Sequence, residues 1–150
     1  MGKFKTRLLG SAAAAVVLGA GLVTLTATPA AALGTCTSAI TITTSSGADT
    51  TAIVPGLSSG VSWNPGECQL AKGNSGAGVK AMQRGLNACY GAGLTADGIF
   101  GDKTRTALIA AQNRVGVSAD GIFGPKTRQA LYWMVYNDEG PLNCRYVPRA

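Results

Sequence analysis

The chain has 150 residues and a net charge of +6, from 13 lysines and arginines against 7 aspartates and glutamates, and it contains no histidine. Without an imidazole base, nucleophile systems of the Ser–His–Asp and Cys–His types are excluded, as are the common hydrolytic zinc sites. A glycosidase that uses two carboxylates stays open, because acidic residues are present.

The first 32 residues have the layout of a secretory signal peptide. Three basic residues precede an apolar run at 8–25, and small residues lead to Ala30-Ala31-Ala32. We expect cleavage before Leu33, which leaves ten basic against seven acidic residues, a net charge of +3. That charge is too small to indicate a nucleic-acid partner. A permanent membrane anchor is the alternative, because the apolar run is near the lower limit for a membrane span. A lipoprotein anchored at Cys36 fits the pattern poorly.

Residues 33–69 form an extension rich in Thr, Ser and Gly. Residues 39–43 alternate apolar and hydroxyl side chains, and residues 51–54 are a second β-prone run. The segment 45–49 between them has turn chemistry. The pattern predicts a small β-hairpin, which needs to be fastened to the rest of the molecule because an isolated hairpin is marginal in water.

The four cysteines indicate two disulfides, because an even count in a small exported chain is typical of a disulfide framework. They are Cys36, Cys68, Cys89 and Cys144. A metal site lacks close ligand pairs. The sequence leaves all three pairings open, and we expect one disulfide to tie down the C-terminal tail at 137–150.

The rest of the chain has helical periodicity and a repeat. Val79, Met82 and Leu86 form a stripe that predicts a helix over 77–88. Residues 96–108 (ADGIFGDKTRTAL) and 119–131 (ADGIFGPKTRQAL) agree at eleven of thirteen positions. Each copy has an Asp-Gly turn, an Ile-Phe pair expected to plug the core, and a glycine before a helix. The two predicted helices run over 102–114 and 125–136, and the copies must pack together to bury their apolar faces.

The doubled motif resembles the type 1 peptidoglycan-binding domain. The resemblance rests on Val79-x-x-Met82-Gln83-x-x-Leu86, the two Asp-Gly-Ile-Phe-Gly-x-Lys-Thr segments that begin at Asp97 and Asp120, and Gln112, and it covers about residues 70–135. It implies a compact three-helix fold that attaches exported proteins to bacterial cell walls. We therefore predict a mainly α fold: a three-helix domain at 70–136 with the duplicated unit, preceded by the β-hairpin extension.

No catalytic residues or cofactors are predicted. Turn and cap roles account for Asp97, Asp102 and Asp120, and Pro125 replaces Asp102 in the second copy, which argues against a catalytic carboxylate pair. Basic and aromatic side chains suit the carboxylates and sugar faces of a wall polymer. The candidate ligand-binding residues are Lys103, Arg105, Lys126, Arg128, Tyr90, Tyr132 and Trp133, although the position of Trp133 also suits core packing.

The predicted function is that of a secreted, monomeric, non-catalytic peptidoglycan-binding protein, extracellular or associated with the cell wall, with no membrane contact after signal cleavage. Two alternatives stay open. One is a secreted interaction or inhibitor module that keeps the fold without affinity for the wall. The other is an accessory subunit of a separately encoded wall hydrolase.

Overall fold

The computed structural model describes residues 33–44, 50–57 and 67–147. All of them lie in one structural unit that spans residues 31–150. The predicted signal peptide at 1–32 and the predicted turn at 45–49 lie outside the described residues. Within the described part of the chain, no helix is long and apolar enough to span a membrane.

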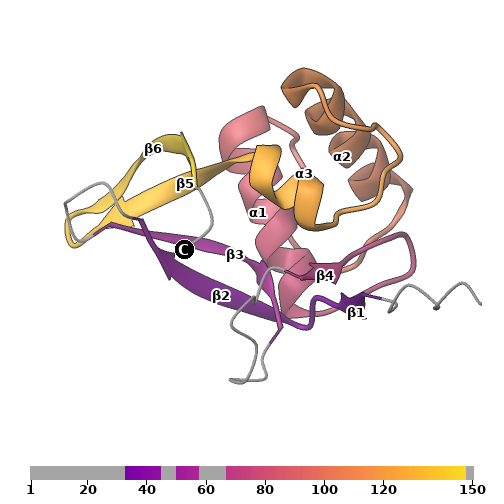
Figure 1. The fold of residues 1–150 in the computed structure, drawn as a ribbon, viewed down its shortest axis with the longest axis horizontal. Helices are drawn as coiled ribbons and strands as arrows, with labels where there is room; N and C mark the ends of the chain where they lie inside the picture. The colour runs from indigo at the N-terminus through magenta and orange to yellow at the C-terminus, as the bar shows by residue number, and fades with distance from the viewer. Residues whose placement is uncertain (1–32, 45–49, 58–66, 148–150) are drawn as a thin grey trace, which may run out of the picture. The chain divides into compact units, whose positions relative to one another are not determined.

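The described elements are six strands and three helices (Figure 1). In chain order they are β1 (Gly34–Thr35), β2 (Ser38–Thr43), β3 (Thr51–Gly56), β4 (Cys68–Gln69), α1 (Ala77–Tyr90), α2 (Asp102–Val115), α3 (Pro125–Ala130), β5 (Tyr132–Asn137) and β6 (Gly140–Tyr146). Strands β2 and β3 occupy the two β-prone runs of the sequence and pair antiparallel. Helices α1 and α2 begin where the sequence places them, and each ends at a left-handed glycine, Gly91 or Gly116.

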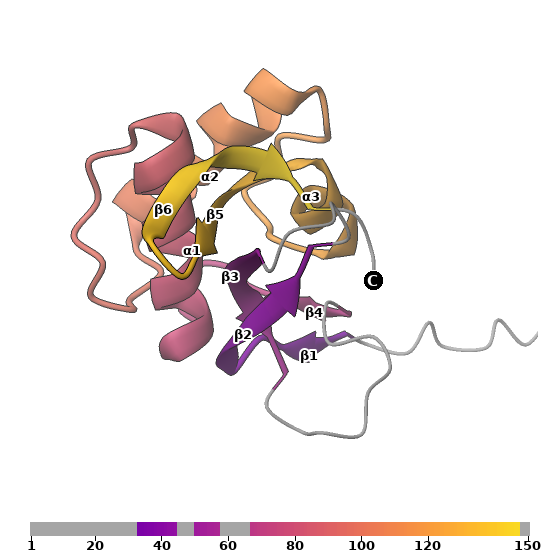
Figure 2. The same ribbon diagram turned by 90° about the vertical axis from the view of Figure 1, so that its left-hand side faces the viewer.

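The prediction of a mainly α fold is wrong. The chain forms a four-stranded antiparallel sheet in the order β2-β3-β5-β6, visible from two sides in Figures 1 and 2, and a two-stranded parallel sheet of β1 and β4. The segment predicted as the end of the third helix is β5, and the predicted tail at 137–150 contributes β6. The three helices are therefore only part of the fold. Strands that precede and follow them in the chain form the four-stranded sheet.

The third helix stops early because its last residues favour extended backbone. Leu131 ends α3 with φ −72° and ψ 145°, and the following Tyr-Trp-Met-Val-Tyr run consists of β-branched, aromatic and flexible side chains. Trp133 and Val135 are buried while Tyr132 is exposed, which is the period-two pattern of a strand. Each of these strand residues pairs with a partner on β6.

One core joins the sheet to the helices. Helix α1 packs against β3 and β5, and its inner face carries two glycines where side chains have no room. A Cβ at Gly85 would lie 2.7 Å from the Trp133 ring, and one at Gly78 would collide with the carbonyl group of Cys36. A glycine in the middle of a helix costs roughly 1 kcal/mol relative to alanine. The close approach of Trp133 on β5 and of the Cys36 backbone between β1 and β2 accounts for the two positions.

Two disulfides and two isolated β-bridges join segments that are far apart in the chain. Cys36 is bonded to Cys68 and Cys89 to Cys144, and no cysteine is free. The first bond joins the segments that carry β1 and β4, and the second joins the end of α1 to β6. Isolated antiparallel bridges, Leu70 to Phe123 and Ser75 to Ile99, connect the segment before α1 with both repeat loops.

Candidate functional site

The first repeat loop is organised around one buried glutamine of α1. Gln83 Nε2 donates hydrogen bonds to Asp97 Oδ1 (2.9 Å), to the Ile99 carbonyl oxygen (3.1 Å) and to Thr104 Oγ1 (3.2 Å). Gln83 Oε1 accepts a bond from the Gly98 N–H at 2.8 Å. Asp97 Oδ1 also accepts from the Ile99 N–H, which closes an Asx turn. Gln83, which is 1% exposed, therefore fixes the whole loop.

The second loop repeats this network with Gln112 of α2. Gln112 Nε2 donates to Asp120 Oδ1 (3.0 Å), to the Ile122 carbonyl oxygen (2.9 Å) and to Thr127 Oγ1 (3.1 Å), and its Oε1 accepts from the Gly121 N–H (2.9 Å). The duplication in the sequence is thus a duplication of a hydrogen-bond network. The two glutamines belong to the motif that carries the family resemblance. No local pattern in the sequence indicates that they hold the loops through these hydrogen bonds.

The aspartates of the loops act as structural acceptors. The Ile99 N–H and the Gln83 side chain hold the pKa of Asp97 below its usual range. A glycosidase general acid needs a carboxyl group whose pKa is raised, so this environment is the opposite of the one required. Asp102, at the start of α2, forms an exposed ion pair with Lys72 at 2.6 Å.

The Ile-Phe pairs divide between core and surface. Phe100 and Phe123 are buried, as predicted, but Ile99 is 60% and Ile122 42% exposed. The prediction that both members of each pair plug the core is therefore wrong for the isoleucines. Successive side chains of an extended segment point to opposite sides, so burial of the phenylalanine turns its neighbour outward.

The four basic candidates of the repeats are not brought together. Lys103 and Lys126 are exposed, but they line different cavities. The Arg105 guanidinium donates a hydrogen bond to the Asp120 carbonyl oxygen at 3.0 Å, which ties α2 to the second loop. Arg128 is only 6% exposed, and its carbonyl oxygen accepts the Trp133 Nε1–H bond at 3.1 Å. Matching positions in the two copies therefore have different surroundings.

This difference predicts unequal effects of the same substitution at the two arginines. Arg128→Gln is expected to lower the free energy of unfolding by about 2 kcal/mol, because it removes a buried side chain and disrupts packing around its stem. Arg105→Gln is expected to cost less than about 1 kcal/mol, because the hydrogen bond that it loses is exposed. Urea unfolding of the two variants measures both values, and equal small effects would contradict the burial of Arg128.

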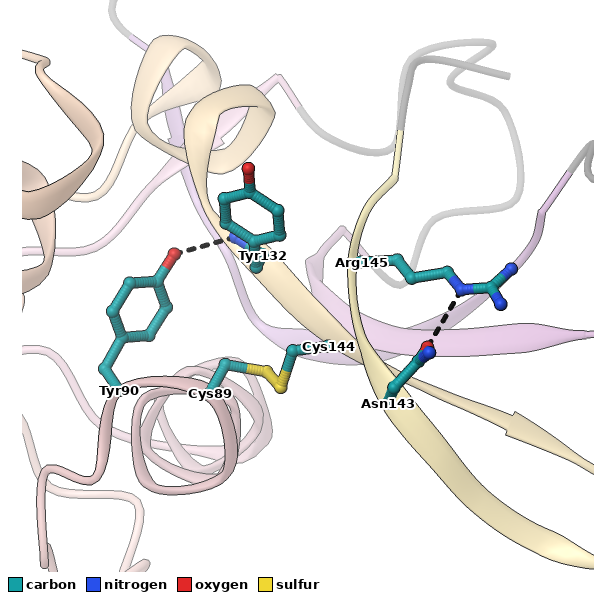
Figure 3. The surroundings of a disulfide bond; sticks show 6 residues. All are labelled: Cys89, Tyr90, Tyr132, Asn143, Cys144 and Arg145. Carbon is teal, nitrogen blue, oxygen red and sulfur yellow. Dashed lines mark hydrogen bonds between the residues drawn. A yellow bond between two sulfur atoms is a disulfide. The ribbon is translucent and has the colours of Figure 1, made fainter.

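The aromatic candidates separate in the same way. Trp133 is 2% exposed and packs edge-on against Phe123, with ring centroids 6.0 Å apart, so it is a core residue. Tyr132 is 49% exposed. The Tyr90 hydroxyl oxygen accepts a hydrogen bond from the Tyr132 N–H at 2.7 Å (Figure 3), and the Arg114 guanidinium lies 5.8 Å from the centre of the Tyr90 ring. Sequence reasoning did not single out Arg114.

Burial raises the pKa of the Tyr90 hydroxyl, although the Tyr132 N–H and the Arg114 guanidinium act in the opposite direction. The hydroxyl is therefore protonated at neutral pH and keeps a proton to donate. The exposed Arg114 guanidinium lies within cation–π distance of the ring, so a positive charge is placed beside the Tyr90 hydroxyl. We call these two side chains the Tyr90–Arg114 pair.

The Tyr90–Arg114 pair forms a wall shared by two cavities. The first, the α1–α2 cavity, has a volume of about 670 Å³. Its lining includes Tyr90, Leu94, Asp102, Lys103, Ala107 and Arg114. The second, the hairpin cavity, has a volume of about 630 Å³ and is lined by Tyr90, Arg114, Val115, Ala130, Tyr132 and the Cys89–Cys144 disulfide. Three of the seven predicted ligand-binding residues, Tyr90, Lys103 and Tyr132, lie on these two cavities.

Among the residues that the structure describes, no group of three or more His, Cys, Asp or Glu side chains could hold a metal ion. An aromatic face, a guanidinium and a lysine suit a ligand with apolar ring faces and carboxylates.

The region that contains the two repeat loops and the α1–α2 cavity is similar to known proteins. Residues 75–131 match the family model described as "Putative peptidoglycan binding domain". A peptidoglycan-binding protein from Clostridioides difficile, solved in complex with glutamine hydroxamate, is 37% identical over 54% of this chain and 49% of that chain, with a TM-score of 0.42. The endolysin of Burkholderia AP3 phage is 46% identical over 39% of this chain and 22% of that chain, with a TM-score of 0.35.

The chain thus spans about half the length of the Clostridioides difficile protein and less of the endolysin. No curated protein matches the chain. The family match includes both glutamine-centred loops and every residue of the α1–α2 cavity, and it ends one residue before β5. The match over residues 75–131 therefore confirms the resemblance to a peptidoglycan-binding domain drawn from the doubled motif.

Proposed function

We propose that the protein is exported and binds peptidoglycan without cleaving it, and that the α1–α2 cavity holds the peptide part of the polymer. The observation that carries this proposal is the Tyr90–Arg114 pair, which forms one wall of a cavity built entirely from family-matched residues. Lys103 adds a second cation and Asp102 a carboxylate to the same lining. Peptides with both free carboxylates and amines find partners of both signs there.

The acidic residues support binding in place of catalysis. Asp97 and Asp120 accept hydrogen bonds inside the loops, and Asp102 pairs with Lys72. A retaining or inverting glycosidase needs one carboxyl group as an acid and a second as nucleophile or base. Asp97 and Asp120 are instead committed to hydrogen bonds within the loops.

Sedimentation with purified, insoluble cell-wall sacculi tests the proposal. We expect the protein in the pellet and no released sugars or peptides in the supernatant. Binding should weaken as salt rises, because exposed charges are screened over about 10 Å at 0.1 M. Arg114→Gln should weaken binding about 10- to 150-fold, as expected for the loss of a charge-assisted bond worth about 1.5–3 kcal/mol.

Lys80→Gln is the matched control, because Lys80 is exposed on α1 and lines neither cavity. Equal losses for Arg114→Gln and Lys80→Gln would point to non-specific attraction by net charge. A protein that stays in the supernatant would leave the interaction or inhibitor module as the better hypothesis. Released muropeptides would refute the non-catalytic assignment.

A further inference from the structure

The β5–β6 hairpin adds a surface that the family match does not include. The match ends at residue 131, whereas the hairpin spans Tyr132–Asn137 and Gly140–Tyr146. Its β5 strand pairs with β3, and the Cys89–Cys144 disulfide bonds β6 to the end of α1. The hairpin is thereby fixed beside Tyr90 (Figure 3).

Two tyrosines of this hairpin are exposed side by side. Tyr132 and Tyr146 lie directly opposite each other in the register of β5 and β6, so their side chains share one face of the sheet. They are 49% and 53% exposed. The Tyr132 backbone is held by the Tyr90 hydroxyl, and Tyr146 lies two residues from the disulfide. Binding to such preorganised rings loses little conformational entropy.

The hairpin cavity extends from the Tyr132 ring to a single cation, and Tyr146, which is not among its lining residues, lies opposite Tyr132 on the hairpin. Among the described residues that line the cavity, Arg114 is the charged one, and Tyr90, Val115, Ala130 and Tyr132 supply apolar surface. The charge favours an anionic ligand, because a guanidinium binds a carboxylate through two parallel hydrogen bonds. The aromatic faces favour a ligand with flat, C–H-rich surfaces, and a pyranose ring has such faces.

We propose that the hairpin cavity is a glycan subsite: the Tyr132–Tyr146 pair stacks on a hexosamine ring, and Arg114 binds the carboxylate or peptide-linked acyl oxygen that this sugar carries. This inference rests on the proposed function. In peptidoglycan the peptide branches from the sugar chain, so one branched unit has both kinds of ligand group. The Tyr90–Arg114 pair lies between the cavities, which lets the sugar lie on the hairpin while the peptide enters the α1–α2 cavity.

Such a composite site binds the linked ligand more tightly than either part. Once one part is bound, the other is held at a high effective concentration and binds intramolecularly. A disaccharide that carries its peptide should therefore bind at least tenfold more tightly than the peptide-free glycan or the free peptide.

The test uses the full mature protein with three probes: the disaccharide-peptide, a peptide-free glycan chain and the free stem peptide. The double variant Tyr132→Ala/Tyr146→Ala is expected to lose glycan binding and to bind the disaccharide-peptide about tenfold more weakly. Its affinity for the free peptide should not change. Leu142→Ala is the control, because Leu142 is an exposed apolar residue of β6 that lines neither cavity. Thermal melts of both variants verify that the hairpin is folded.

Each other outcome overturns the subsite. If the double variant binds all three probes like wild type, the tyrosines do not contact the glycan, and peptidoglycan binding through the α1–α2 cavity can still hold. If it loses peptide and glycan equally, the hairpin shapes the α1–α2 cavity and is not a separate subsite. If wild type binds sacculi but no glycan probe, recognition is by peptide alone. If wild type does not bind sacculi, both proposals fail together.

Discussion

Replacing Gln112 with leucine is expected to lower the free energy of unfolding by about 3–5 kcal/mol, because one buried N–H left without a partner costs about 1–3 kcal/mol and each further hydrogen bond lost costs about 0.5–1.5 kcal/mol. Leucine has nearly the same volume, so the substitution removes the hydrogen bonds and leaves the packing almost intact. The Gly121 N–H loses its partner. Asp120, the Ile122 carbonyl oxygen and Thr127 each lose one hydrogen bond and keep another. Gln83→Leu should have a similar effect on the first loop.

Urea unfolding and amide hydrogen exchange measure this prediction. The exchange of the Gly121 amide should accelerate strongly in the Gln112 variant, and that of Gly98 in the Gln83 variant. Asn113→Leu is the matched control, because Asn113 is the exposed neighbour of Gln112 on α2. If Gln112→Leu unfolded at the same urea concentration as Asn113→Leu, the network would contribute little to stability.

Much of the helical part of the fold can be predicted from local signals. The stripes of α1 and α2 have the helical period, and a glycine ends each helix in a left-handed conformation. Strand β2 follows from its alternation of apolar and hydroxyl residues, and β3 follows from a β-prone run that ends in proline and glycine. These signals lie within each segment, which is why the sequence is sufficient for them.

The end of the chain cannot be predicted in this way, because its structure depends on non-local pairing. Leu131, Met134 and Val135 fit a helical stripe, while Trp133 and Val135 fit the alternation of a strand. The segment forms a strand and not a helix because it pairs with β3 on one side and with β6 on the other. No local pattern shows that availability, nor does any local pattern choose among the possible disulfides.

The candidate site was only partly predictable for a related reason. The repeat suggests that equal residues have equal surroundings, but α2 has 14 residues and α3 only six. The early end of α3 leads directly into β5, whose Trp133 donates a hydrogen bond to the carbonyl oxygen of the buried Arg128, whereas Arg105 is exposed on α2. Arg114 has no counterpart in the second copy, so a search for shared cations passes over it.

Phe123→Ala is expected to lower the free energy of unfolding by about 3–5 kcal/mol, the usual cost of truncating a buried phenylalanine. It should also lower the melting temperature by more than 10 °C, since about 1 kcal/mol corresponds to about 4 °C in a domain of this size. The ring is fully buried and packs edge-on against Trp133, while its backbone is bridged to Leu70. Its loss therefore affects the repeat loop, the sheet and the segment before α1 together. Phe100→Ala should have a similar cost in the first loop.

The exposed neighbours provide the controls for both phenylalanines. Ile99→Ala and Ile122→Ala should each change the free energy of unfolding by less than about 1 kcal/mol, because surface substitutions usually have small effects. Near-ultraviolet circular dichroism adds a local readout, because Phe123→Ala removes the ring that packs against Trp133 and Ile122→Ala does not. If Ile122→Ala destabilised the protein as much as Phe123→Ala, the side chains of the loop would be placed incorrectly. If Phe123→Ala melted like wild type yet no longer bound sacculi, the ring would belong to the binding surface and not to the core.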